Sequence, residues 1–361
     1  MKSDCSNPDV AVLNGILLIN EGKPADAVEA LQKAARNNPE SVDIKLWLAR
    51  AAEAKGDMAL AQQSFQDAAK LSPRNLLVKQ GLAHIAIQRR DFTLLTQLAE
   101  ETMVLAPQSP EPFIWRGMAE ASQKSFDKAE ADFRQAIKLN PKDSTAYLEL
   151  GQLRLVQQKL PEARTFLEQA LENNPNSGRA LRLLVALDLH DRQPAKGLAR
   201  IQAQIAKSPQ NGEFYDQLSE LQYLTGDAAG ALASAQAALK INPADGAAVM
   251  ALTHAQVAHG DAAQAIATWQ KWTVDHPKDA QAFAILGSLQ EGQGNTDQAT
   301  ASYKKALQID PDQPVASNNL AYLMVQTGQN LDVALTLAQN ARRILPNAPS
   351  TADTLDRKSV V

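Results

Sequence analysis

Cysteine is almost absent from this sequence, and aromatic residues are few. Cys5 is the only cysteine among 361 residues, and Phe, Trp and Tyr together make up 5%. A single cysteine excludes an internal disulfide framework and a cysteine-ligated metal cluster. No apolar run approaches the ~20 residues of a transmembrane helix, and residues 1–7 lack the apolar core of a signal peptide. The formal net charge of −4 gives no reason to expect a nucleic-acid or membrane-surface partner.

The sequence does contain regularly spaced prolines. Nine of them follow one another at a constant interval of 34 residues, and a tenth comes 35 residues after the ninth: Pro39, Pro73, Pro107, Pro141, Pro175, Pro209, Pro243, Pro277, Pro311 and Pro346. Proline lacks a backbone donor and disfavours helix in the residue before it, so each of these prolines predicts a helix end. A fixed period of this length indicates a repeat protein, in which each repeat packs on its neighbours.

Three columns of small residues run through the repeats when position 1 is set 31 residues before each phased proline. Position 8 is Gly, Ala or Ser in eight of the ten repeats, position 20 is Ala in eight, and position 27 is Ala in seven. Position 7 is Leu in eight repeats. Small residues let two helices approach closely while leucines fill the space beside them. Four repeats mark a turn between the small columns: Gly56-Asp57, Gly226-Asp227, Gly260-Asp261 and Gly294-Asn295. Each repeat is therefore predicted to form two helices joined by a tight turn.

This pattern resembles the tetratricopeptide repeat (TPR) family. Residues 144–177 show it whole, with Gly151, Ala163, Ala170 and Pro175 in the characteristic places. The resemblance implies an all-α, right-handed solenoid with a concave groove. Ten repeats are expected, and their ranges are 8–41, 42–75, 76–109, 110–143, 144–177, 178–211, 212–245, 246–279, 280–313 and 314–348.

The third and sixth repeats depart from the small-residue columns. They carry larger or different residues at these places: Leu95 and Thr102, and Val185, Gly197 and Gln204. Helical hairpins with an altered packing angle are expected there.

Both ends of the chain break the pattern. Residues 1–7 read as the remnant of a preceding repeat or a leader, and residues 349–361 as the start of an eleventh repeat. In that register position 8 is Asp356, where a small residue is expected. We interpret residues 356–361 as an artefact, because a common sequencing adapter encodes this hexapeptide in one frame. A natural polar tail is the alternative.

No pattern in the sequence indicates catalysis or a cofactor. The five histidines form no ligand set: His84 and His254 lie five repeats apart, and His254 and His259 share no helix face. There is no glycine-rich phosphate loop and no nucleophile motif. Solvent-exposed or packed histidines and a charged helix surface are the simpler interpretation.

The resemblance also indicates where a partner would bind. In TPR proteins, positions 2, 5, 9, 12 and 13 of the first helix line the groove, with position 6 at its border. Repeats four to seven place apolar residues there: Ile114, Trp115, Met118, Leu148, Leu155, Val156, Leu189, Tyr223 and Leu224. An exposed apolar stripe rimmed by charge is typical of a protein-binding surface. The alternative is that these side chains pack against the neighbouring repeat. The family's carboxylate clamp is not expected, because position 5 has no Lys and position 9 no Asn.

The sequence thus predicts a non-enzymatic scaffold that binds a protein or peptide segment in its groove. Residues 318–355 are similar to the closing repeats of large bacterial cell-envelope and export TPR proteins, so a cytoplasmic or a periplasmic location is open. A second hypothesis is the repeat region of a larger protein whose catalytic domain (a glycosyltransferase, kinase or protease) lies beyond Leu355. End-to-end association of copies is a third.

Overall fold

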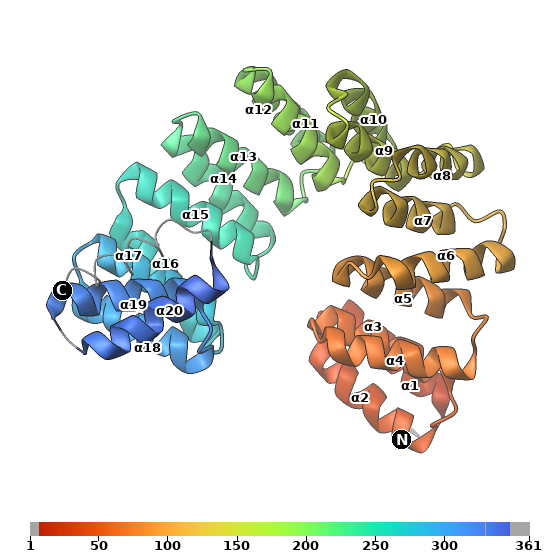
Figure 1. Cartoon of the computed structure of the whole chain (residues 1–361), viewed down its shortest axis with the longest axis horizontal. Coiled ribbons are helices and arrows are strands. Elements are labelled where there is room, and N and C mark those ends of the chain that lie inside the picture. The colour runs from red at the N-terminus through yellow and green to blue at the C-terminus, as the bar shows by residue number, and fades with distance from the viewer. Residues whose placement is uncertain (1–6, 329, 347–361) are drawn as a thin grey trace. The chain divides into compact units, whose positions relative to one another are not determined.

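The computed structural model describes residues 7–328 and 330–346, and over these residues it contains twenty α-helices and no strand. The expected leader, the start of the eleventh repeat and the terminal hexapeptide lie outside them, apart from Asn7. The chain divides into two compact units, residues 1–187 (the N-terminal unit) and 188–361 (the C-terminal unit). Figure 1 shows the helices following one another in pairs along each unit. The predicted all-α repeat solenoid is confirmed.

The helices α1 to α10 belong to the N-terminal unit: α1 Pro8–Asn20, α2 Pro24–Asn37, α3 Val42–Lys55, α4 Met58–Leu71, α5 Leu76–Arg89, α6 Phe92–Leu105, α7 Glu111–Ser122, α8 Phe126–Leu139, α9 Ser144–Val156 and α10 Leu160–Asn173. The remaining helices are α11 Gly178–His190, within which the two units divide, α12 Pro194–Lys207, α13 Gly212–Leu224, α14 Ala228–Ile241, α15 Gly246–His259, α16 Ala262–Asp275, α17 Ala280–Gly292, α18 Thr296–Ile309, α19 Pro314–Thr327 and α20 Leu331–Ile344.

Side-chain caps and prolines set where the helices begin and end. Asp57 starts α4 by accepting a hydrogen bond from the amide of Leu60, at 3.1 Å. Asp143 starts α9 by accepting from the amides of Thr145 and Ala146, at 2.9 and 3.1 Å. These bonds satisfy amides that have no partner inside the helix. At the end of α8 the chain turns at Asn140 and Pro141, which cannot continue the helix.

The turn inside each repeat places position 15 in the left-handed region of the backbone. Six repeats have glycine there: Gly22, Gly56, Gly226, Gly260, Gly294 and Gly328. The third to sixth repeats have Arg90, Lys124, Gln158 and Arg192, with φ between 56° and 61°. The left-handed turn is therefore present in these four repeats although they lack glycine at position 15.

Close approach between the two helices of a repeat explains the small residue at position 8. A Cβ atom on Gly117 would lie 2.6 Å from a ring carbon of Phe133, and one on Gly151 would lie 2.7 Å from Leu167. Phe133 and Leu167 are fully buried. The small column thus makes room for the large side chain at position 24 of the second helix.

The third and sixth repeats form helical hairpins despite their unusual residues. Leu95 is fully buried and Thr102 is nearly so on α6. Gln204 is buried on α12, and Arg200 of the same helix donates to Asp188 of α11 at 2.9 Å. Leu95 and Thr102 in the third repeat, and Gln204 in the sixth, thus take the place of the small residues at positions 20 and 27.

Candidate functional site

The apolar residues expected in the groove of the fourth repeat are largely buried. Ile114 and Trp115 on α7 are only 4% and 8% exposed. Ile114 joins a cluster with Phe133 and Leu150, whereas Trp115 joins the cluster formed by the first three repeats. Met118 is half-buried and packs against both clusters. Two of these three side chains therefore fill the space between repeats in this structure.

The other expected groove residues differ in exposure. Leu148 on α9 is buried, and Leu155 and Leu189 are half-buried. Tyr223 is 42% exposed. Val156 and Leu224, at position 13 of their repeats, are also exposed. Helices α7 and α9 lie in contact, which brings the candidates of the N-terminal unit near one another, whereas Leu189 and Tyr223 belong to the C-terminal unit.

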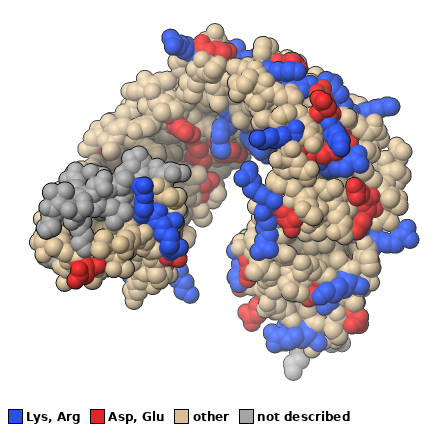
Figure 2. Space-filling view, in the orientation of Figure 1, with Lys and Arg blue, Asp and Glu red and all other residues tan. Residues whose placement is uncertain are grey.

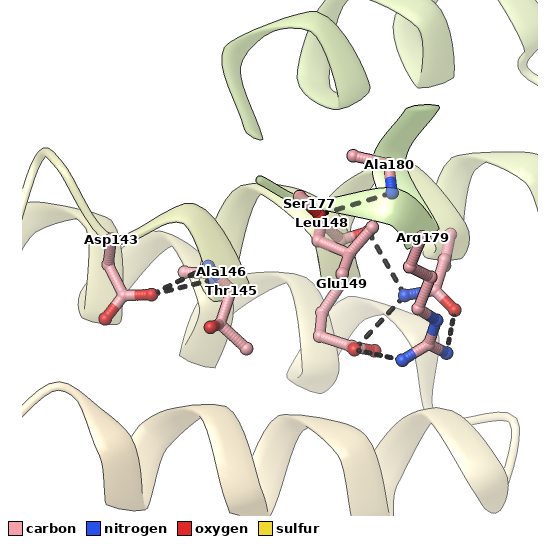
Figure 3. A network of polar contacts seen from close by, with 9 residues as sticks. Asp143, Thr145, Ala146, Leu148, Glu149, Ser177, Arg179 and Ala180 are labelled. Atoms are coloured by element: carbon pink, nitrogen blue, oxygen red, sulfur yellow. Dashed lines mark hydrogen bonds and ion pairs between the residues drawn. The ribbon is translucent and has the colours of Figure 1, made fainter. Parts of the chain in front are cut away.

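A polar cluster lies beside these residues at the junction of α9 and α11 (Figure 3). The carboxylate of Glu149 accepts a hydrogen bond from Gln152 at 3.1 Å, and its Oε1 lies 3.5 Å from Nη1 of Arg179. Arg179 also donates to the side-chain oxygen of Gln152. Burial raises the pKa of Glu149, while Arg179 and Gln152 act in the opposite direction. Position 6 of the fifth repeat, at the border of the groove, is thus occupied by the buried carboxylate of Glu149, which has two partners.

A pocket opens in the C-terminal unit, on the face formed by the first helices of the repeats. Its volume is about 360 Å³. It is lined by residues of α13, α15, α17 and α19, and by Gln313 just before α19: Tyr223, Met250, Thr253, His254, Val257, Gln281, Ala284, Ile285, Ser288, Leu289, Gln313 and Val315. Most of these occupy positions 2, 5, 9 and 12, where the resemblance places the groove. Tyr223 is the one sequence-predicted site residue in this lining.

The rim of the pocket is apolar and partly aromatic. Tyr223 stacks on His254 with 5.7 Å between ring centroids and 27° between planes. Val257 and Val315 are exposed, at 47% and 41%. Ala284 on α17 is buried and also lines the cavity.

The polar groups at the floor of the pocket are already hydrogen-bonded. The hydroxyl of Ser288 donates to the carbonyl of Ala284 at 3.1 Å and accepts from Asn319 at 3.3 Å. Tyr303, which bonds to Asn319 beneath the pocket lining, donates to the carboxylate of Glu291 at 2.7 Å, and burial raises the pKa of its phenol. Thr253 accepts from Trp269 at 2.7 Å. The surface that the pocket offers to a ligand is therefore chiefly apolar.

The described residues present no arrangement typical of a metal site or a membrane span. Within residues 7–328 and 330–346, no group of three or more His, Cys, Asp or Glu side chains is placed to hold a metal ion. His84 instead bonds to Glu53 at 2.8 Å, and His259 to Asp261 at 2.8 Å. No helix in the same residues is long and apolar enough to cross a bilayer.

Four segments of the chain match models of known repeat families. Residues 12–75 and 116–178 match one tetratricopeptide repeat model, residues 222–289 match a second, and residues 292–328 match a TPR repeat model. The chain belongs to the tetratricopeptide repeat family. It is a repeat scaffold of the kind that mediates protein interactions.

Solved structures of similar fold are repeat proteins as well. A tetratricopeptide repeat protein from Parabacteroides merdae matches with a TM-score of 0.51 and 16% identity, over 69% of this chain and 98% of that one. Pseudomonas aeruginosa PilF matches with 0.45 and 19%, over 57% and 94%. MamA from Desulfovibrio magneticus matches with 0.42 and 16%, over 49% and 99%. At these identities the likeness concerns the fold alone. No curated protein sequence matches the chain significantly.

Proposed function

We propose that this chain is a non-enzymatic interaction protein that binds a partner polypeptide through the pocket of the C-terminal unit. The observation that carries the proposal is a preformed apolar pocket at the repeat positions that line the groove. A volume of about 360 Å³ falls within the range of small-molecule pockets and is large enough for an aromatic or branched side chain. The rim residues Tyr223, Val257 and Val315 would contact the segment on either side of that anchor.

Two further properties support a peptide ligand. The pocket lies on successive helices that pack on one another, α13 on α15 and α17 on α19, so little ordering is needed on the protein side. The hydroxyl groups of Ser288 and Thr253 are already hydrogen-bonded within the protein, so binding of an apolar side chain beside them leaves neither without a partner.

The sequence-predicted residues enter this proposal in different roles. Tyr223 is a direct contact at the rim. Met118, Leu155 and Leu189 are half-buried and are proposed as contacts for other parts of a long segment. The buried Ile114, Trp115 and Leu148 would support the groove through repeat packing.

Selection of displayed peptides on the full chain would test the proposal. Peptides with an aromatic or branched apolar residue should be enriched. Their affinity, measured by fluorescence anisotropy, should fall at least tenfold in Val257→Glu, because binding would then bury a carboxylate against the apolar peptide at the rim of the pocket. Val274→Glu is the matched control, because Val274 is 77% exposed on α16 and does not line the pocket. Selected peptides that bind Val257→Glu and the wild type equally would contradict the proposal.

A further inference from the structure

The turns inside the second to fifth repeats differ from those of the seventh to ninth, whereas the sixth repeat also has a basic residue there, Arg192. In the second to fifth repeats they carry five basic side chains at positions 14 to 16: Lys55, Arg89, Arg90, Lys124 and Lys159. In the seventh to ninth repeats the same turns read Gly226-Asp227, Gly260-Asp261 and Gly294-Asn295. Because equivalent turns of stacked repeats lie along one edge of an array, the basic side chains form a row on one edge of the N-terminal unit. We refer to these five residues as the basic edge.

The backbone of the basic edge is held in a conformation that favours glycine. Arg90 and Lys124 have φ of 56° and 61°, and Gln158 has 59°. Side chains with a β-carbon are disfavoured in this left-handed region, and six other repeats use glycine there. The third to fifth repeats thus keep long polar side chains at a cost in stability. Residues that are unfavourable for their backbone conformation, and that recur in successive repeats, indicate that these positions serve a function other than folding.

The charged groups of the basic edge are exposed, and most of them have no ion-pair partner. Lys55, Arg90, Lys124 and Lys159 are exposed, and none of them forms an ion pair within the described residues. Arg89 donates a hydrogen bond to the neutral side chain of Gln62.

Four carboxylates lie at or beside the same turns and offset part of the positive charge of the row. Asp57 and Asp91 accept hydrogen bonds from the amides that begin α4 and α6, at 3.1 and 3.0 Å. Asp127 lies in the first turn of α8, and Glu162 pairs with Arg154 at 2.7 Å. The carboxylates are thus directed toward helix starts or an arginine of the protein itself.

A second set of residues adds apolar character to this edge. Position 17, the first residue of the second helix, is Met58, Phe92, Phe126 or Leu160 in these four repeats. Each is half-buried, and the first three pack with one side against core clusters. In the C-terminal unit the same position is Pro194, Ala228, Ala262, Thr296 and Leu331. Large apolar side chains therefore accompany the basic ones, repeat by repeat.

We propose that the basic edge docks the N-terminal unit onto an anionic lipid surface. Clusters of four to eight Lys and Arg side chains are typical of segments that bind anionic lipid headgroups. Half-buried apolar residues beside the cations suit the boundary between headgroups and acyl chains. A single-stranded nucleic acid would instead call for exposed stacking aromatics along a basic groove. The net charge does not reveal this surface, because residues 1–187 hold equal numbers of acidic and basic side chains and the basic edge is only one part of them. Figure 2 shows both kinds of charge distributed over the face of this unit that is in view.

The test is sedimentation of the full chain with phosphatidylcholine vesicles, with and without phosphatidylglycerol. Binding is expected only with the anionic lipid, and it should weaken as salt is raised. The double variant Arg90→Gly with Lys124→Gly should bind roughly thirtyfold more weakly, since each cation near such a surface contributes about fivefold. This variant should not unfold, because glycine suits both turns.

The matched control is Gln158→Gly, which makes the same backbone change without removing a charge. It should bind anionic vesicles as the wild type does. Equal binding by the double variant and the wild type would overturn the proposal, and so would equal binding to neutral vesicles. If a single-stranded oligonucleotide binds as tightly and loses affinity with the same substitutions, the basic edge is a polyanion site and the lipid assignment is wrong.

Discussion

At the scale of single residues, the glycines at position 8 act through the volume they leave free. In the fourth repeat the ring of Phe133 occupies the space where a side chain on Gly117 would lie, and Phe133 is fully buried. The interior of a protein is packed too densely to absorb such an addition without displacement. Position 8 is therefore a determinant of how closely the paired helices approach.

Gly117→Ala is expected to destabilise the fold by about 1–3 kcal/mol, the usual cost of overpacking a well-packed core. Gly292→Ala is the control, because a Cβ there meets nothing within 4 Å. At the end of α17 it should be neutral or slightly stabilising, since alanine favours helix over glycine. Midpoints of urea unfolding followed by circular dichroism would show the difference. Equal effects of the two substitutions would refute the role assigned to the Phe133 contact.

The buried carboxylate of Glu149 makes stability depend on pH. Burial raises its pKa in the folded state. Its contribution to stability is then fully present below the ordinary glutamate pKa and is lost as pH rises through the raised pKa. Glu149→Gln, a neutral mimic of the protonated acid, should raise the unfolding midpoint at neutral pH and have little effect in acid. The partial ion pair with Arg179 does not reverse the sign, because Arg179 is largely exposed.

Unfolding of Glu149→Gln at neutral and acidic pH would check this expectation. Glu172→Gln is the control, because Glu172 is an exposed carboxylate of the same unit and its removal changes the net charge equally. A midpoint that falls at neutral pH only in Glu149→Gln would mean that the bonds from Arg179 and Gln152 outweigh the cost of burial.

At the scale of helices and turns, all ten repeats have a left-handed residue at position 15, which is glycine in six repeats and a long polar residue in four. Lys124→Gly and Gln158→Gly should each stabilise the N-terminal unit by about 1 kcal/mol, because glycine relieves the left-handed strain. The reverse change, Gly260→Lys, should destabilise the C-terminal unit by a similar amount. Thermal unfolding of the three variants would measure this. A loss of stability in Gln158→Gly would indicate that contacts of the long side chain exceed the strain.

Periodicity in the sequence predicted the helices, but tertiary packing decided which side chains reach the groove. Prolines at a constant spacing and small residues at positions 8, 20 and 27 are local features, so they indicate helix ends and contact faces directly. Ile114 and Trp115 show the limit, because an apolar residue at position 5 or 6 can face the groove or the next repeat. The pocket was not predicted because its lining comes from helices of four repeats, and no single repeat contains enough of it to reveal it. Likewise, the turn at Arg90 has no glycine to reveal its left-handed backbone.

At the scale of the whole molecule, the two proposed surfaces lie in different units. The pocket is formed by α13 to α19, and the basic edge by the turns of the second to fifth repeats. Helices contact their immediate neighbours along the array, as α13 does with α14 and α15. In repeat proteins stability is therefore close to a sum of local terms. The two surfaces should respond separately to substitution: Val257→Glu should leave vesicle binding unchanged, and Arg90→Gly with Lys124→Gly should leave peptide binding unchanged.

The same local coupling predicts how far the effect of a bound peptide extends. A short peptide that fills only the pocket contacts α13, α15, α17 and α19, and stabilises these helices and those packed on them. Because each repeat transmits this only through its neighbours, amide hydrogen exchange should slow in residues 212–328 and stay unchanged in α1 to α10. Mass spectrometry of exchanged fragments, with and without a selected peptide, would measure it. Protection of equal size in α1 to α10 would instead show that the array opens as one cooperative unit, and the pocket would then control the stability of the basic edge in the other unit.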